Sequence, residues 1–191
     1  EPEPSDEELD ELPISAVMDG EVQTFPDAAA LDEALNAAPA GNFRITDDHL
    51  GEGGAKQKYA RNIAAIRTLF QLEQEHRGAT AEEQEMLSQY VGWGGLADCF
   101  DERHFKYKEL KALLTDEEYV AARSTTLNAH YTSPVIIKEM YTAISNMGFK
   151  EGNILESSCG IGNFMGLIPD EMGNSKFYGV EIDDLTGRIA K

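Results

Sequence analysis

The stretch that most constrains the fold is residues 154–164, in which a short apolar run is followed by an acidic residue and two glycines. We predict a strand that ends at Glu156, a turn through Gly160 and Gly162, and then the start of a helix. Glycines let the backbone of such a turn approach a ligand closely, because no Cβ stands in the way. The N-terminus of the following helix offers unpaired N–H groups to an anionic group.

A second apolar run, residues 177–183, is predicted to form the next strand and ends in carboxylates. Glu181 follows Gly160 by 21 positions, and about 20 residues separate the glycine turn from the ribose-binding acid in nucleoside-binding α/β units. A lone Gly-x-Gly also serves plain strand-to-helix connections. The order of strand, glycine turn, helix, strand and acid favours a nucleoside cofactor instead.

The spacing of the glycines narrows the choice of cofactor. The nicotinamide dinucleotide motif requires a third glycine three positions after the second, and this chain has Met165 there. The chain has no Gly-Lys-Ser or Gly-Lys-Thr run, which excludes a P-loop. S-adenosylmethionine, a nucleoside cofactor without a pyrophosphate, fits what remains.

Two motifs resemble those of a known enzyme class. The pattern Glu156-x-x-x-Gly160-x-Gly162 resembles motif I of S-adenosylmethionine-dependent methyltransferases, and residues 130–134 resemble the motif X segment of amino-methyltransferases acting on DNA adenine. Residues 42–191 resemble the N-terminal region of very large proteins of conjugative elements and phages. These join a DNA adenine methyltransferase to a Swi/Snf-type helicase, and some are associated with anti-restriction. The most family-specific runs are residues 91–96 and 124–131.

The resemblance implies the first part of a Rossmann-like methyltransferase fold, α/β and truncated, with S-adenosylmethionine as cofactor. It implies that Tyr131 packs on the methionine end of the cofactor, that Thr132 donates to its carboxylate, and that Glu156 orients the turn or reaches its amino group. The family usually has Pro where this chain has Ser157. The cofactor-binding residues expected are Tyr131, Thr132, Glu156, Ser158, Gly160, Gly162, Asn163, Phe164, Glu181 and Ile182.

Glu181 is expected to accept hydrogen bonds from the ribose hydroxyls and Ile182 to pack against the adenine, whereas Asp183 and Asp184 are expected to cap the next helix. Adenine methylation in the family uses an Asn/Asp-Pro-Pro-Tyr/Phe motif, whose oxygens accept the hydrogens of the amine and whose aromatic ring stacks on a flipped base. The chain has no such run. We therefore assign no catalytic residue and expect the chain alone to be inactive.

We also expect the chain to be a fragment of a longer protein that reaches DNA and holds the rest of the methyltransferase and the helicase in cis. No apolar run approaches the ~20 residues of a membrane span. Cys99 and Cys159 are too few for a zinc cluster or a disulfide scaffold, which favours a cytoplasmic protein without a metal site.

The net charge of −19 argues against a DNA-binding surface. Residues 1–50 hold 14 of the 35 acidic residues and a single base, Arg44. We therefore divide the chain into an acidic disordered tail or linker (1–41), a helical subdomain (42–127) and the first part of a methyltransferase domain (128–191).

Apolar residues at helical spacing predict helices over residues 56–76 and 103–114, and an Ala-rich helix over 27–38 with Asp27 as cap. Capping boxes at Thr80 and Thr115 predict two more, and Ser133 with a following Pro predicts another. The only tryptophan, Trp93, lies in a Gly92–Gly95 turn. It is either a packing anchor or a stacking surface near the substrate, and packing is favoured.

Three alternatives stay open. The first is that the chain is a degenerate methyltransferase-like scaffold or DNA-handling module without activity. The presence of Ser157 where the family usually has Pro supports this alternative. Alternatively, it belongs to a methyltransferase for a protein glutamine or another small amine, which would share motif I and the strand-end acid. A third alternative is an interaction module whose acidic tail matters most.

Overall fold

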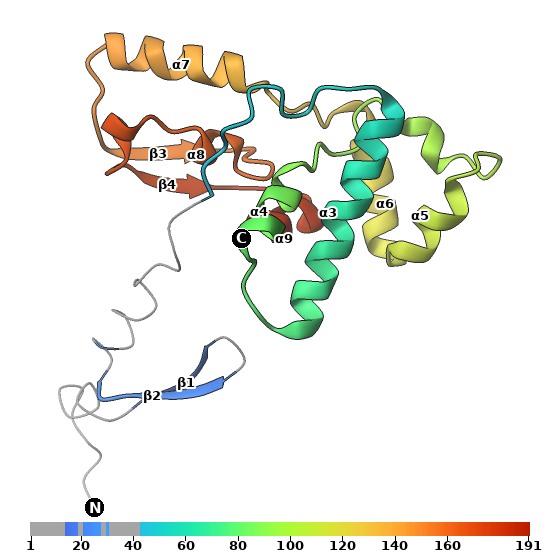
Figure 1. The fold of residues 1–191 in the computed structure, drawn as a ribbon, viewed down its shortest axis with the longest axis horizontal. Helices are drawn as coiled ribbons and strands as arrows, with labels where there is room; N and C mark the ends of the chain where they lie inside the picture. Colours follow the sequence, from blue (N-terminus) through green and yellow to red (C-terminus); the bar gives the residue numbers. More distant parts are fainter. Residues whose placement is uncertain (1–13, 19–20, 28–29, 31–42) are drawn as a thin grey trace, which may run out of the picture. The chain divides into compact units, whose positions relative to one another are not determined.

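The computed structural model describes residues 14–18, 21–27, 30 and 43–191. The chain divides into two compact units, one formed by residues 1–42 with 72–78 and the other by residues 43–71 with 79–191. The second unit contains the predicted site and most of the helices and strands drawn in Figure 1.

The first unit holds an antiparallel hairpin of β1 (Ile14–Met18) and β2 (Glu21–Phe25), in which Met18 pairs with Glu21 and Ile14 with Phe25. The prediction of a disordered tail over 1–41 is therefore wrong for these two strands. Asp27 behaves as the predicted cap, because its Oδ1 accepts a hydrogen bond from the Ala30 N–H at 2.7 Å. The rest of the Ala-rich helix and the remainder of the predicted tail lie outside the described residues.

The first half of the second unit is helical, as predicted. Its elements are α3 (Ala55–Glu75, which continues into the first unit), α4 (Ala81–Ser88), η1 (Ala97–Phe100), α5 (Tyr107–Leu113), α6 (Asp116–Ser124) and η2 (Thr125–Leu127). Both capping boxes are confirmed: Thr80 and Thr115 each accept from the backbone N–H of a Glu three positions on, whose side chain accepts from the threonine N–H.

The helix predicted over residues 103–114 begins only at Tyr107. Asp101 explains the difference, because its Oδ1 accepts from both the backbone N–H and the Nε of Arg103, each at 2.9 Å. A short acidic side chain that satisfies nearby backbone in this way competes with helix formation.

The second half combines helices with a parallel two-stranded sheet, so that the described structure is of mixed α/β type. Its elements are α7 (Pro134–Asn146), β3 (Asn153–Glu156), α8 (Asn163–Gly166), η3 (Asp170–Met172), β4 (Lys176–Gly179) and α9 (Asp184–Ile189). Asn153 pairs with Lys176 and Glu156 with Gly179. Ser133 occupies the N-cap position of α7 as predicted, but its hydroxyl makes no capping bond.

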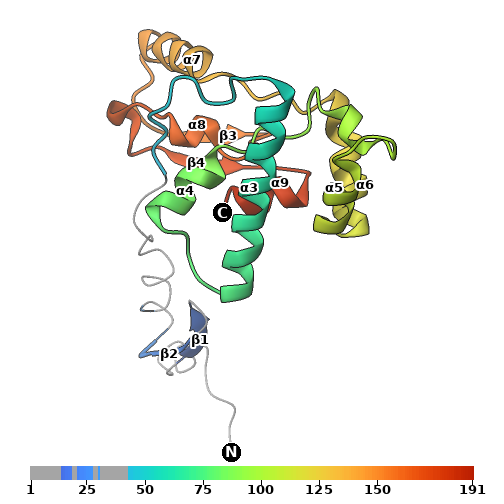
Figure 2. The same cartoon turned by 45° about the vertical axis from the view of Figure 1, so that its right-hand side comes forward.

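Helix α7 covers one face of the sheet, as Figures 1 and 2 both show. Its buried Ile137 and Tyr141 form a small core with Leu167 and Met172, and Phe177 of β4 packs against this cluster. Successive side chains of a strand point to opposite faces of the sheet. On the face away from α7, the paired residues Leu155 and Tyr178 are 68% and 45% exposed.

The larger core joins the two halves. Tyr59, Ile63 and Ile66 of α3 pack in one cluster with Trp93, confirming the predicted apolar stripe. Leu185 and Ile189 of α9 belong to the same cluster. The expected subdomain boundary at residues 127–128 is thus crossed by a shared core. Among the described residues, no helix is both long and apolar enough to cross a membrane.

Candidate functional site

The glycine turn follows β3 and leads into α8. Gly160 and Gly162 have φ values of +57° and +85°, in the left-handed region that favours glycine. Backbone hydrogen bonds hold the two strand ends together beyond the sheet: the Val180 N–H donates to the Glu156 carbonyl at 2.9 Å, and the Cys159 N–H to the Val180 carbonyl at 3.0 Å. The turn therefore lies at the carboxyl end of both parallel strands, where ligands bind in open α/β sheets.

Two predicted boundaries at this turn are wrong. The sequence predicts the helix after the turn near residues 163–168, but α8 has four residues and ends at Gly166, so its dipole gives little attraction to an anion. Strand β4 ends at Gly179 instead of Asp183. Glu181 consequently stands in the loop beyond the strand. Asp183 takes the N-cap position of α9 as predicted, but its side chain makes no capping bond, and Asp184 is the first residue of the helix instead of a cap.

Glu181 ties the turn to the loop after β4. Its Oε2 accepts a hydrogen bond from the Gly160 N–H, and its Oε1 accepts one from the Asp183 N–H, both at 2.9 Å. The side chain is partly buried. Each carboxylate oxygen has two lone pairs, so each keeps one acceptor position for a ligand hydroxyl.

The ring of Tyr131 lies between two glycines. A Cβ added to Gly160 would stand 2.9 Å from one of its ring carbons, and a Cβ added to Gly92 would stand 2.8 Å from another. Carbon atoms do not approach so closely, so both positions need glycine for this packing. Burial raises the pKa of Tyr131, which keeps its hydroxyl protonated.

The Gly92–Gly95 turn supports the segment that carries Tyr131. A Cβ on Gly94 would meet the Ala129 carbonyl oxygen at 2.0 Å, and the Trp93 side chain beside it is fully buried. The Trp93 ring packs edge-to-face on Phe100, with centroids 5.3 Å apart. The packing interpretation of Trp93 is thereby confirmed.

Asn62 was missed by the sequence reasoning. It is fully buried on α3, donates through Nδ2 to the Gly92 carbonyl at 2.5 Å and accepts through Oδ1 from the Val91 N–H at 2.9 Å. The amide thus fixes the entry to the glycine turn. A single polar residue beside a buried apolar stripe is the only signal that the sequence offers for it.

Three buried polar atoms near the two glycine turns lack a hydrogen-bond partner within the described part of the chain. They are the Tyr90 hydroxyl, the Trp93 Nε1 and the Asn163 Oδ1. Asn163 is the first residue of α8 and is 8% exposed. A buried acceptor without a donor costs free energy, and a bound amine or hydroxyl would satisfy it.

The other predicted residues are distributed around the turn. Glu156 ends β3 half-buried, and burial raises the pKa of its carboxyl. Thr132 is half-buried, Ser158 is exposed, and Ile182 is 98% exposed. Phe164 instead belongs to the small core, where its ring packs edge-to-face on Tyr141 and its carbonyl accepts from the Tyr141 hydroxyl at 2.7 Å. That position gives Phe164 a structural role.

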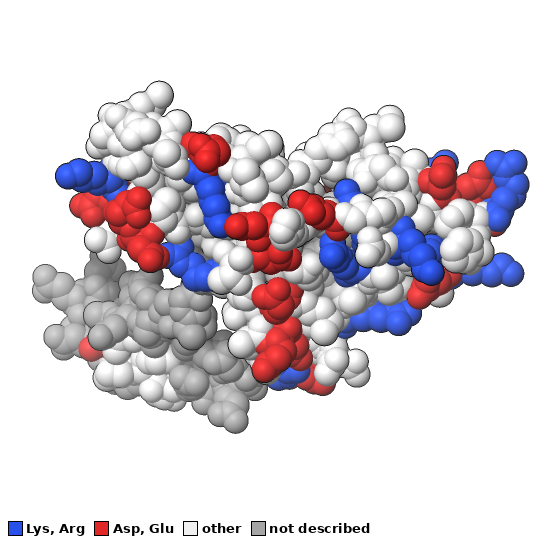
Figure 3. Space-filling model, turned by 45° about the horizontal axis from the view of Figure 1, so that its top comes forward, with Lys and Arg blue, Asp and Glu red and all other residues white. Residues whose placement is uncertain are grey.

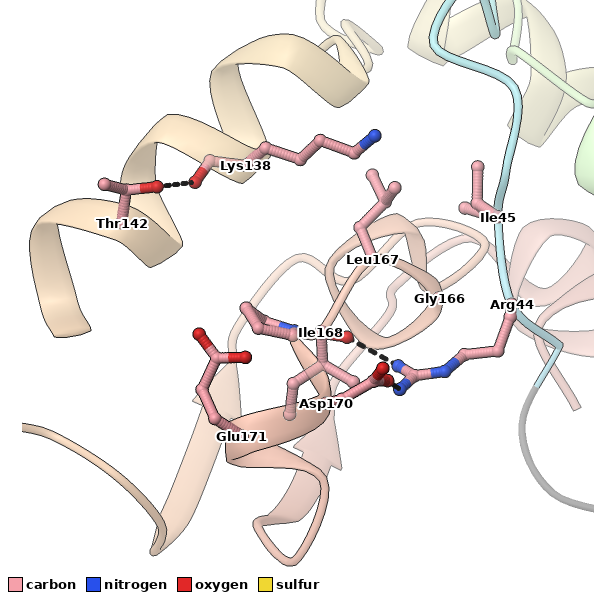
Figure 4. A pocket seen from close by; sticks show the side chains of 10 residues that line it. Arg44, Ile45, Lys138, Thr142, Gly166, Leu167, Ile168, Asp170 and Glu171 are labelled. Carbon is pink, nitrogen blue, oxygen red and sulfur yellow. Dashed lines mark hydrogen bonds and ion pairs between the residues drawn. The ribbon is translucent and has the colours of Figure 1, made fainter.

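A separate hollow of about 420 Å³ opens beside α7 and contains none of the ten predicted residues. Figure 4 shows Arg44 turned toward the loop after α8, where it donates to the Ile168 carbonyl and to Asp170, each at 2.6 Å. Lys138 lines the hollow from α7 and pairs with Asp48. Both cations of the hollow are therefore already paired with carboxylates.

Within the described residues, no three His, Cys, Asp or Glu side chains gather as a metal site would require. Comparisons of the chain with protein-family models, with curated proteins and with solved structures found no match.

The residues at the glycine turn fit a nucleoside linked to an amino acid. Glu181 retains acceptor positions for two hydroxyls, and the exposed Ile182 follows it directly. The Asn163 Oδ1 is an acceptor in need of a donor. The side chain of Thr132 makes no hydrogen bond within the described part of the chain and is free to donate.

Proposed function

We propose that this chain provides the S-adenosylmethionine-binding part of a DNA adenine-N6 methyltransferase. The observation that carries the proposal is the meeting of three separated motifs at one point: the Gly160 turn, the Glu181 carboxylate bound to it, and the Tyr131 ring packed on it. The resemblance to motifs X and I predicted that these segments act together. No metal is part of the proposal.

In this proposal Glu181 would hold the ribose hydroxyls, Ile182 the adenine, and Thr132 the carboxylate of the methionine end. Asn163 and Glu156 would accept from its amino group, directly or through water. When bound, the cofactor supplies an electrophilic methyl group. The residues of this chain bind and orient it, and Tyr131 excludes water from the turn.

Methyl transfer needs groups that this chain does not have. The lone pair of the adenine amine is delocalised into the ring, so the amine needs oxygen acceptors for its hydrogens and an aromatic ring for the flipped base. No Asn/Asp-Pro-Pro-Tyr/Phe run occurs in the sequence. We propose that such a motif, further strands and a helicase lie in the rest of a larger cytoplasmic protein of a mobile element, with a role connected to anti-restriction.

Titration calorimetry with S-adenosylmethionine tests the cofactor assignment. Glu181→Gln removes the charge and keeps one oxygen acceptor, but its NH2 group then faces one of the two backbone N–H groups that the carboxylate accepts from. Hydrogen bonds to charged groups contribute about 1.5–3 kcal/mol. We expect the affinity to fall by about 10-fold or more. Glu171→Gln, an exposed residue beside the α7 hollow, serves as the matched control and should bind as the unchanged chain does.

A second candidate function is a methyltransferase-like scaffold that binds no cofactor. It is favoured by the internal closure of the turn, in which both Glu181 oxygens accept from backbone and Tyr131 covers Gly160. The same titration separates the two. A chain that is folded by circular dichroism but shows no heat of binding at millimolar S-adenosylmethionine would support the scaffold.

A further inference from the structure

Two segments of this acidic chain are rich in basic residues. Its formal net charge is −19, yet residues 55–71 and 103–111 together hold eight of its 16 Lys and Arg residues and one acidic residue, Glu109. The first of these segments forms most of α3, and the second forms the approach to α5 and α5 itself. Lys and Arg side chains spread over the right-hand part of Figure 3, where α5 and α6 lie in Figure 1, and Asp and Glu side chains lie among them.

The two basic segments contact each other. The Tyr59 hydroxyl of α3 donates to Glu109 of α5 at 3.1 Å, and the Lys106 Nζ lies 3.5 Å from the centroid of the Tyr59 ring. Arg67 pairs with the same Glu109 at 3.1 Å. Lys56 precedes Tyr59 by three positions and so stands on the same side of α3. The Lys106 Nζ also lies 5.7 Å from the centroid of the Phe105 ring. These contacts join α3 to the segment of residues 103–109, and we call the exposed cations and ring of the two segments the α3/α5 basic surface: Lys56, Arg67, Arg103, Phe105, Lys106 and Lys108.

Two of the five cations on this surface, Lys56 and Lys108, have neither a carboxylate within ion-pair distance nor a ring contact in the described part of the chain. Lys106 also lacks a carboxylate partner there, but its Nζ lies on the Tyr59 ring. Arg103 pairs with Asp101 at 2.6 Å, and its side chain is 89% exposed. Exposed pairs of this kind contribute little stability, so a phosphate can recruit the guanidinium at small cost.

Phe105 adds an aromatic ring to the charges. It is 82% exposed and lies between Arg103 and Lys106 in the sequence. Its ring centroid is 4.6 Å from that of His104, with the rings tilted by 33°. Exposed rings set among cations are how proteins hold single-stranded nucleic acid, because each base offers a face for stacking and each phosphate a charge.

We propose that the α3/α5 basic surface binds single-stranded DNA, with Phe105 stacked on an unpaired base and the lysines on phosphates. The choice of DNA among polyanions rests on the proposed function. The assignment of the surface rests on the contacts above. An acidic chain thereby gains a local surface that DNA approaches, although the overall charge argues against one.

Fluorescence anisotropy with a labelled 20-nucleotide strand and its duplex, without S-adenosylmethionine, tests the inference. The variants are Phe105→Ala and the pair Lys56→Gln with Lys108→Gln. Lys150→Gln with Lys191→Gln makes the same change in charge outside the surface and is the matched control. Vesicles of phosphatidylserine form a further arm.

We expect the single strand to bind more tightly than the duplex. Phe105→Ala should weaken single-strand binding about 5- to 150-fold, the range measured for one stacked base. The lysine pair should lower the slope of log affinity against log salt by about 1.4, since each phosphate contact on a single strand contributes about 0.7. The control pair should leave the slope unchanged.

Three results would overturn the inference: equal binding by Phe105→Ala, equal weakening by the control pair, or Phe105-dependent binding to vesicles without binding to DNA. The last would assign the surface to membranes. Because the DNA measurement is made without the cofactor, its failure would not affect the interpretation of the S-adenosylmethionine titration. Failure of that titration likewise leaves the DNA measurement interpretable.

Discussion

The carboxylate of Glu181 accepts a hydrogen bond from the backbone N–H of Gly160 at 2.9 Å, although the two residues are 21 positions apart. The bond joins the loop after β4 to the turn after β3. It brings the strand-end acid to the glycine turn, where a nucleoside cofactor would need it. Because the acid also holds the turn, its removal should affect the shape of the site as well as its charge.

The first prediction concerns Gly92, whose φ is +66° and which abuts the Tyr131 ring. Gly92→Ala should destabilise the chain for two reasons. A left-handed conformation costs an Ala about 1–2 kcal/mol, and the new Cβ would meet a ring carbon at 2.8 Å. We expect the Tm, measured by circular dichroism, to fall by about 2–4 °C for each kcal/mol lost.

Gly95→Ala is the control for this change. Gly95 has a similar φ of +73°, but nothing lies within 4 Å of an added Cβ. It therefore carries the backbone cost alone, and the difference between the two variants isolates the contact with Tyr131. Equal Tm values for both variants would show that the ring does not press on Gly92.

A second prediction concerns Asn62, which uses both amide atoms to hold the backbone of Gly92 and Val91. Asn62→Asp keeps the acceptor but removes the donor, leaving the Gly92 carbonyl facing a carboxylate in the core. We expect a loss of about 1–3 kcal/mol or more in the free energy of unfolding, measured by urea denaturation. The exposed Asn128→Asp should cost far less, and a comparable cost for both would refute the assigned role.

Local signals in the sequence predicted most of the helices and the core. The two capping boxes form as expected, and Tyr59, Ile63 and Ile66 are buried on one stripe. These features depend on residues within one or two turns of each other. The local sequence therefore determines the caps and the apolar stripe, and no contact with a distant segment is needed to predict them.

Features that depend on pairing or on competing local bonds were harder to predict. The β1–β2 hairpin was missed, although Asp19 and Gly20 between its strands form a dipeptide favoured in two-residue hairpin turns. The start of α5 was displaced by the bonds of Asp101 to Arg103. The contact of Tyr131 with both Gly92 and Gly160 joins three distant segments, and no local pattern contains it.

A third prediction follows from the pair of Glu118 and Arg188, which joins α6 to α9 at 2.7 Å with side chains 11% and 26% exposed. Burial alone would raise the pKa of Glu118, but hydrogen bonds from the Thr115 backbone and from Arg188 outweigh it, and the pKa is lowered. The stability from this group is complete above its unfolded pKa of about 4.3 and is lost as the pH falls through the folded value.

Thermal denaturation between about pH 6 and pH 3 measures this contribution. The Tm of the unchanged chain should fall more steeply below about pH 4.3 than that of Glu118→Gln, which has no charge to lose. Glu117→Gln, its exposed neighbour, should follow the unchanged chain. Parallel curves for the unchanged chain and Glu118→Gln would show that the pair contributes nothing.

The last prediction separates packing from ligand stacking at Trp93, the only tryptophan of the chain and fully buried. Trp93→Phe gives up part of the contact area of the ring but keeps an aromatic ring in the core. Trp93→Ala should lower the free energy of unfolding by about 3–5 kcal/mol, as for other buried aromatic residues, and Trp93→Phe should lower it clearly less.

The fluorescence emission of Trp93 in the native chain should be blue-shifted and should shift to the red on unfolding. Because the ring packs on Phe100 in the core, saturating S-adenosylmethionine or single-stranded DNA should leave the emission unchanged. Strong quenching of the Trp93 emission by either ligand in the folded chain would indicate that Trp93 stacks on a ligand in a binding site and would contradict the prediction.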